Sequence, residues 1–173
     1  MKDELRKQLK IRRALFQGEA RERADIAICE KFLSSFSRYE SFFIYNSFSS
    51  EADTKRITGA LLDAGKRVYL PRVEGLHMRA VPYGKTQIGA YGIEEPSGQA
   101  FEGEIQVTLV PLLAVNKKLY RVGYGKGYYD RYLKNRRTLK IGLGYSFQIE
   151  EFKEDEWDEP LDAFVCEKEI YEK

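Results

Sequence analysis

The glycine-rich segment 121–130 has the residue types of an anion-binding loop. An arginine opens it, glycines alternate with a tyrosine and a lysine, and tyrosines and an aspartate close it, in the order Arg121, Val122, Gly123, Tyr124, Gly125, Lys126, Gly127, Tyr128, Tyr129 and Asp130. Glycine lets a backbone turn tightly and present its N–H groups to a ligand, and a cation within such a loop suits phosphate. The segment is not a Walker loop, because Gly127 stands where serine or threonine is required. It is not the dinucleotide fingerprint, because Tyr128 stands where glycine is required.

Four basic residues near the start of the sequence share one face of a predicted helix. They recur every three to four residues, at Lys2, Arg6, Lys10 and Arg13. Such a stripe is either a solvated polar face or a basic arm over the phosphates of a ligand, where arginine binds bidentately and lysine acts as a point charge. The spacing alone leaves both interpretations open.

Candidate acidic groups lie in three places. Glu51 follows a strand-like run, where it is either a charge at the start of the next helix or a carboxylate that recognises donor groups of a polar heterocycle. Asp130 closes the glycine-rich segment, and Asp158 lies in an acidic stretch further on. Magnesium takes one or two carboxylates and completes its shell with water and phosphates. The later aspartates therefore belong either to a solvated surface or to a magnesium site with Asp130.

The composition is that of an ordinary soluble globular protein. The 173 residues are 43% hydrophobic and 32% charged, which predicts one domain over 1–173. The net charge of +2 argues against bulk nucleic acid as a partner. Two distant cysteines favour free thiols in a reducing compartment, and no apolar run is long enough for a membrane span, so we expect a cytoplasmic protein. With one histidine, His77, and no nucleophile elbow, Ser-His-Asp hydrolysis is disfavoured.

Hydrophobic periodicity predicts an alternation of helices and strands. The expected helices are 2–16, 19–37, 53–64 and 128–136. The expected strands are 42–45, 68–70, 105–110, 139–143 and 163–166, with Pro71 ending the second and short strands and loops over 72–104. This alternation indicates an α/β fold, a single domain with a central, mostly parallel sheet flanked by helices. Ligands of such sheets bind beyond the carboxyl ends of the strands, where 111–130 would lie.

Taken together, the ordered motifs resemble the 5-formyltetrahydrofolate cyclo-ligase family, also called methenyltetrahydrofolate synthetase, over nearly the whole sequence. The most specific motif is 121–133, and the supporting ones are 2–6, 51–54, 92–96 and 158–162. The resemblance implies an enzyme that uses ATP and magnesium to convert 5-formyltetrahydrofolate to 5,10-methenyltetrahydrofolate, with ADP and phosphate as products. It also implies that the formyl oxygen attacks the γ-phosphate of ATP to give an imidate phosphate, which a neighbouring folate nitrogen then closes into a ring.

The same resemblance implies roles for individual positions. Lys126 and Arg121 would be catalytic. ATP would contact Lys2, Arg6, Arg121, Gly123, Tyr124, Gly125, Lys126, Gly127, Tyr128 and Tyr129. The reduced folate would contact Asn46, Glu51, Tyr124 and Tyr128. Magnesium would be held by Asp130 and Asp158. The expected partners are these small molecules alone, with no nucleic acid and no membrane, and we expect a monomer.

The sequence departs from the family pattern just before the glycine-rich segment. The family usually has a Phe-Asp pair and then a glycine, whereas here these positions are Val115, Asn116 and Leu119, and Val122 replaces a common leucine. The turn is therefore expected to differ in shape, although the glycine, lysine and aspartate set is complete. Two alternatives stay open: a non-catalytic folate- or nucleotide-binding module on the same fold, and a small RNA-binding protein, which the near-neutral charge disfavours.

Overall fold

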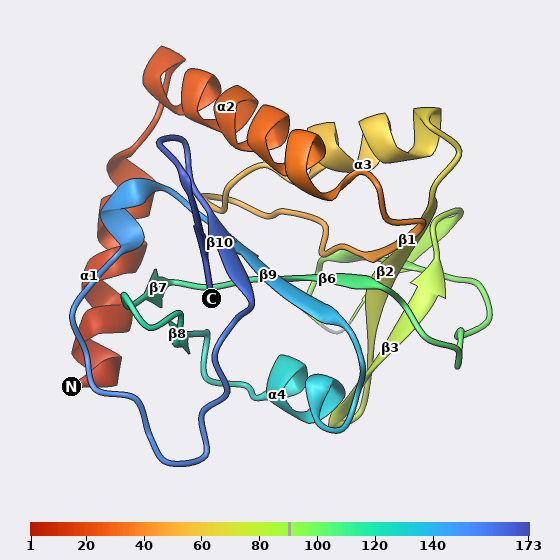
Figure 1. Ribbon diagram of the computed structural model, residues 1–173. Helices are drawn as coiled ribbons and strands as arrows, with labels where there is room; N and C mark the ends of the chain where they lie inside the picture. The colour runs from red at the N-terminus through yellow and green to blue at the C-terminus, as the bar shows by residue number, and fades with distance from the viewer. Residues whose placement is uncertain (90) are drawn as a thin grey trace.

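The computed structural model describes residues 1–89 and 91–173. Its centre is a seven-stranded sheet with the strand order β11-β10-β9-β6-β1-β2-β3 (Figure 1). These strands are β1 (Ser41–Phe43), β2 (Arg67–Glu74), β3 (His77–Pro82), β6 (Val107–Val110), β9 (Leu139–Leu143), β10 (Ala163–Val165) and β11 (Ile170–Glu172). The five inner strands run parallel, and β3 and β11 are antiparallel at the two edges. The mostly parallel sheet predicted from the sequence is confirmed.

Helices cover both faces of this sheet. Figure 1 shows α2 and α3 over one face, α4 on the opposite side and α1 at one end, beside the small β7–β8 hairpin. The helices are α1 (Lys2–Leu15), α2 (Glu19–Phe36), α3 (Lys55–Asp63) and α4 (Tyr128–Leu133), and the remaining elements are β4 (Thr86–Ile88), β5 (Glu94–Pro96), β7 (Ala114–Val115), β8 (Arg121–Val122) and the short 3-10 helix η1 (Ser146–Gln148). Among the described residues, no helix combines the length and the apolar character that crossing a bilayer requires.

The alternation of side chains along β1 divides the core between the two faces of the sheet. Phe42 packs edge-on against Phe32 of α2, with ring centroids 6.2 Å apart. The next residue, Phe43, points to the other face and contacts Tyr132 of α4, with centroids 4.7 Å apart. The short, wholly buried β1 therefore packs against α2 on one face of the sheet and against α4 on the other. These contacts fix the position of the segment that follows β1.

The end of the second strand was predicted wrongly. Pro71 does not end β2, which continues to Glu74 and pairs there with β3. The register with β1 stops at the pair Phe43 and Tyr69, so Pro71 lies beyond the last β1 partner, where its missing N–H breaks no ladder bond. The extended β2–β3 ribbon forms one wall of the cavity described below.

Helix boundaries were also shifted. The third helix begins at Lys55 with Thr54 as its N-cap, and the Asp53 carboxylate accepts the Lys55 N–H at 2.9 Å from outside the helix. The fourth helix ends at Leu133 rather than 136, and Asn135 has a φ of +63° that no helix continues. The β7–β8 hairpin and β11, whose strands are two or three residues long, were not predicted from the sequence.

Candidate active site

A cavity of about 580 Å³ opens beyond the carboxyl ends of β1 and β6. Its walls come from the start of α1, the segment after β1, the β2–β3 ribbon, the β8–α4 loop and residues 155–159. Every site residue predicted from the sequence lines it: Lys2, Arg6, Asn46, Glu51, Arg121, Gly123, Tyr124, Gly125, Lys126, Gly127, Tyr128, Tyr129, Asp130 and Asp158. The structure thus brings all of them together, and which ligand each contacts stays a prediction.

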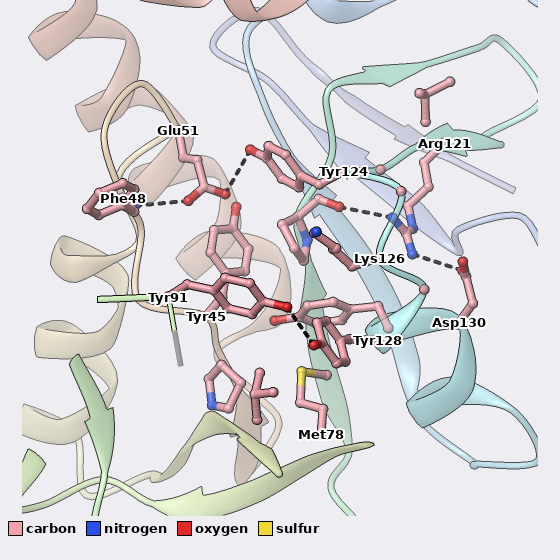
Figure 2. A pocket seen from close by; sticks show the side chains of 18 of the residues that line it. Tyr45, Phe48, Glu51, Met78, Tyr91, Arg121, Tyr124, Lys126, Tyr128 and Asp130 are labelled. Carbon is pink, nitrogen blue, oxygen red and sulfur yellow. Dashed lines mark hydrogen bonds and ion pairs between the residues drawn. The ribbon is translucent and has the colours of Figure 1, made fainter. Parts of the chain in front are cut away.

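Glu51 occupies one end of the cavity, in the tight turn that follows β1. Its two carboxylate oxygens accept different donors, the backbone N–H of Phe48 at 2.9 Å and the hydroxyl of Tyr124 at 3.2 Å (Figure 2). Burial raises the pKa of Glu51, and the two hydrogen bonds oppose that shift. The arrangement leaves an acceptor group at fixed orientation in a half-buried setting, which suits a ligand with N–H donors.

The glycine-rich segment takes its shape from two left-handed residues. Gly125 and Gly127 have φ values of +91° and +74°, which side chains other than glycine rarely adopt. Gly127 is also the N-cap of α4, so the loop runs directly into that helix. Arg6 of α1 donates from Nε to the carbonyl oxygen of Gly123 at 2.9 Å, which fixes the loop against the first helix.

Arg121 lies at the base of this loop and is largely buried. It donates to the Pro111 carbonyl at 3.3 Å and to an oxygen of Asp130 at 2.9 Å (Figure 2). Burial lowers the pKa of Arg121, and the Asp130 carboxylate opposes that shift. Asp130 itself is 79% exposed, so its remaining oxygen is open to the cavity mouth.

Lys126 projects into the cavity between these two ends. Its ammonium lies 5.7 Å from the ring centroid of Tyr91, whose hydroxyl bonds that of Tyr128 at 2.8 Å (Figure 2). Within residues 1–89 and 91–173, Lys126 forms no ion pair. A cation held by an aromatic face alone can turn toward an anionic ligand without breaking a salt bridge.

The acidic stretch closes the cavity near α1. Lys2 pairs with Asp155 and, at 2.9 Å, with Asp158, whose oxygen also accepts the Asp155 N–H at 2.8 Å. Partial burial lowers the pKa of Lys2, but its bonds to the two aspartates outweigh this and raise the pKa. The acidic residues near the end of the sequence are therefore part of the cavity rather than a merely solvated surface.

Two carboxylates of the cavity, Asp130 and Asp158, could each offer an oxygen to a metal ion. Asp130 and Asp158 each use one oxygen in an ion pair and keep another. In the described part of the chain no three metal-ligating side chains are grouped. A site with one or two carboxylates, completed by phosphates and water, is the usual magnesium arrangement.

Sequence reasoning missed several residues that line the cavity. They are aromatic or apolar groups from distant segments: Tyr45, Phe48, Met78, Tyr91 and Trp157. Trp157 is 80% exposed beside the acidic stretch. These residues belong to no sequence motif. Only the exposed Trp157, next to the acidic stretch, could have been suspected from the sequence.

Arg13 differs from the other members of the basic stripe. It is buried, and it donates to the Ser50 hydroxyl and to the Leu112 carbonyl, both at 3.2 Å. Its guanidinium also lies 5.6 Å from the ring centroid of Tyr124. The stripe is therefore neither wholly solvated nor wholly a ligand arm, because this residue packs beneath the cavity wall.

The departures at Asn116 and Leu119 have a structural counterpart. The Asn116 side-chain oxygen accepts the N–H groups of Lys118 and Tyr120 at 3.0 Å. Its amide nitrogen donates to the Phe152 carbonyl at 3.2 Å and to Glu154 at 3.3 Å, which an aspartate could not do. Leu119 has a φ of +69°, the left-handed region that glycine favours.

Comparison with known proteins gives a consistent result. The model of the 5-formyltetrahydrofolate cyclo-ligase family matches residues 1–167. The 5-formyltetrahydrofolate cyclo-ligase of Mycoplasma genitalium is 45% identical over 76 residues, 43% of this chain and only 46% of that relative. The Escherichia coli cyclo-ligase is 31% identical over 143 residues, 75% of this chain and 79% of that one. The structure of Aquifex aeolicus 5,10-methenyltetrahydrofolate synthetase has a TM-score of 0.87 at 34% identity, over 99% of this chain and 92% of that one.

The fold and these comparisons define a single-domain α/β protein built like the solved 5,10-methenyltetrahydrofolate synthetase. The chain belongs to the 5-formyltetrahydrofolate cyclo-ligase family. The family and the fold class predicted from the sequence are confirmed.

Proposed function

We propose that this chain converts 5-formyltetrahydrofolate to 5,10-methenyltetrahydrofolate at the expense of ATP, with release of ADP and phosphate. The observation that carries the proposal is the pairing, in one cavity, of an oriented carboxylate with a cationic glycine loop. Glu51 offers an acceptor for the folate heterocycle, and Lys126, without an ion pair among the described residues, offers a cation for phosphate.

The reaction needs two bond exchanges. The formyl oxygen attacks the γ-phosphorus of ATP, and the bond from that phosphorus to the bridging oxygen breaks, so that ADP leaves. The formyl carbon of the resulting imidate phosphate is then attacked by the neighbouring folate nitrogen, which gives up its proton. The carbon–oxygen bond breaks, phosphate leaves, and the five-membered ring is closed. No side chain of the protein becomes covalently attached.

The chain contributes charge and position to this chemistry. Phosphoryl transfer depends mainly on alignment and on neutralising charge. We assign that role to Lys126 and Arg121, supported by the backbone N–H groups of 123–127, while Lys2 and Arg6 contact the nucleotide from α1. Magnesium, held by Asp130 and Asp158, would supply further neutralisation of the phosphates.

The other end of the cavity would hold the folate. Glu51 and Asn46 face the cavity from the segment after β1, and Tyr124 and Tyr128 enclose it from the glycine loop. Holding the folate nitrogen beside the activated formyl carbon makes ring closure an intramolecular step within a bound complex. The half-buried, oriented carboxylate of Glu51 can hold the folate in this position without taking part in proton transfer.

An ultraviolet absorbance assay tests the proposal directly. Protein and magnesium are mixed with 5-formyltetrahydrofolate, and the methenyl chromophore is followed with and without ATP. We expect it to grow only when ATP is present, with phosphate released in equal amount. A flat trace from folded protein that binds ATP would instead support a non-catalytic binding module.

We further propose that the protein works as a monomer in the cytoplasm, on small molecules and without nucleic acid. Both cysteines are buried free thiols, which suits a reducing compartment. Light scattering at micromolar concentration, with and without ATP, measures the oligomeric state.

A further inference from the structure

A buried polar network on α2 lies directly behind the turn that carries Glu51. Arg21 lies in the first turn of the helix, and one of its terminal nitrogens donates to two backbone carbonyls, Ser49 at 2.9 Å and Glu51 at 3.1 Å. Ser49 has a φ of +54°, so the turn includes a residue in a conformation that is costly without support. One guanidinium therefore fixes both sides of a strained backbone turn.

Two further groups complete the network. The hydroxyl of Tyr145 donates to Asp25 at 2.7 Å and accepts from the Nε of Arg21 at 3.2 Å. Asp25 also accepts the backbone N–H of Asp53 at 3.3 Å. Asp25 and Tyr145 are both buried, and the first lies one helical turn after Arg21. The network thus holds residues 49–53 at three backbone positions.

None of these three side chains lines the cavity, so the network acts on a ligand only through the turn. The orientation of the Glu51 carboxylate depends on the backbone between Phe48 and Glu51, because one oxygen accepts the Phe48 N–H. A change of the turn would move that oxygen and alter the bond from the Tyr124 hydroxyl to the other one, but it would leave the loop backbone at Gly123, which Arg6 of α1 holds, in place. The effect would therefore fall mainly on the Glu51 end of the cavity.

We propose that Arg21, with Asp25 and Tyr145, is a positioning residue for recognition of the folate heterocycle by Glu51. The proposal rests on the proposed function, because it takes Glu51 to be the carboxylate that binds the folate. The polar side of α2 would then contribute to substrate affinity, while its apolar side packs in the hydrophobic core.

The test replaces Arg21 with methionine and measures KM for each substrate separately. We expect KM for 5-formyltetrahydrofolate to rise roughly tenfold and KM for ATP to change less than about twofold, because loss of a charged hydrogen bond to the turn affects only the folate end. Arg21→Lys keeps a donor and should recover part of the affinity. Tyr145→Phe, which removes one hydroxyl, should give a smaller rise of the same kind.

Arg23→Met is the matched control, because Arg23 lies two residues away on α2 and, among the described residues, forms an ion pair only with Glu19 at the surface. Thermal unfolding of each variant separates positioning from loss of fold. Equal rises in both KM values, or a rise in Arg23→Met as large as in Arg21→Met, would overturn the proposal, and so would an unchanged folate KM in Arg21→Met or, if that variant does not fold, in Tyr145→Phe. If Glu51→Gln also leaves folate binding unchanged by calorimetry, the assignment of Glu51 fails rather than the network alone.

Discussion

The two ends of the cavity are built in different ways. At the end proposed for the folate, Glu51 is held by two hydrogen bonds, and the turn that carries it is anchored from behind by the network of Arg21, Asp25 and Tyr145. At the end proposed for the nucleotide, the charged groups are paired with one another: the largely buried Arg121 with the exposed Asp130, and Lys2 with Asp158. One end presents a hydrogen-bond acceptor whose orientation is already fixed, and the other end presents ion pairs.

This difference follows from the cost of rearrangement in each setting. Partly exposed ion pairs contribute little net stability, so an incoming triphosphate and its cation can replace them cheaply. A buried polar group left without a partner is costly, so a carboxylate that must recognise a heterocycle is better fixed before the ligand arrives. We infer that the protein orients the Glu51 carboxylate before the folate binds. At the nucleotide end, the charged side chains exchange their ion-pair partners for the ligand when it binds.

The largest expected effect comes from the group between the two ends. Lys126→Ala should lower kcat by about 10²- to 10³-fold, the usual cost of removing one charge-stabilising donor from a transition state. Folate binding should change little, because Glu51 and its donors are untouched. Steady-state rates and a folate titration by calorimetry check this, and unchanged turnover would remove Lys126 from the mechanism.

The next largest effect should be confined to the folate end. Glu51→Gln should raise KM for 5-formyltetrahydrofolate by roughly 10- to 100-fold, since a charged acceptor becomes a neutral one. KM for ATP should stay within about twofold. Glu94→Gln, another carboxylate on the cavity wall, is the control and should behave like the parent protein. Equal loss of ATP affinity would contradict a division of the cavity into two ends.

A smaller effect is expected at Asp130, the exposed carboxylate proposed to bind magnesium at the nucleotide end. Asp130→Asn should slow turnover by about tenfold and shift the magnesium titration to higher concentration, because an exposed carboxylate contributes less than a buried one. The exposed Asp63 at the end of α3 provides the control variant Asp63→Asn. A parental titration curve would count against a metal role for Asp130.

A change at Asn116, which bonds the segment 152–154, should affect the stability of the protein more than its turnover rate. In Asn116→Asp a carboxylate would face the Phe152 carbonyl and Glu154, so the variant should lose about 1 kcal/mol at neutral pH. The loss should shrink at acidic pH, where the new carboxyl is protonated and can donate. Urea unfolding at pH 7.5 and pH 4 measures both values, and a loss independent of pH would point to packing instead.

The smallest effect concerns the stability of the folate end without ligand. Burial raises the pKa of Glu51 in the folded protein, so the folded state binds its proton more readily than the unfolded state does. The favourable contribution is therefore complete below the ordinary glutamate pKa and is lost as pH rises through the raised value. Glu51→Gln should make the ligand-free protein slightly more stable at neutral pH, with no gain at pH 4. Thermal unfolding at the two pH values provides the check.

Part of this organisation could be predicted from the sequence, and the reason lies in the kind of signal. The parallel sheet followed from alternating patterns, and the glycine loop from residue types that few other structures require together. The continuation of β2 past Pro71 could not be predicted, because it depends on where β1 stops beside it. The inward turn of Arg13 depends on Ser50 and Leu112, which the sequence places far away.

The position of Trp157 makes the difference between the two ends observable by optical means. It is the only tryptophan of the sequence, it is 80% exposed, and it lies on the cavity rim beside Asp155 and Asp158. The folate end contains tyrosines instead, so selective excitation of the indole should report on events at the nucleotide end alone. Stopped-flow fluorescence of the unmodified protein could then establish in which order the two substrates bind.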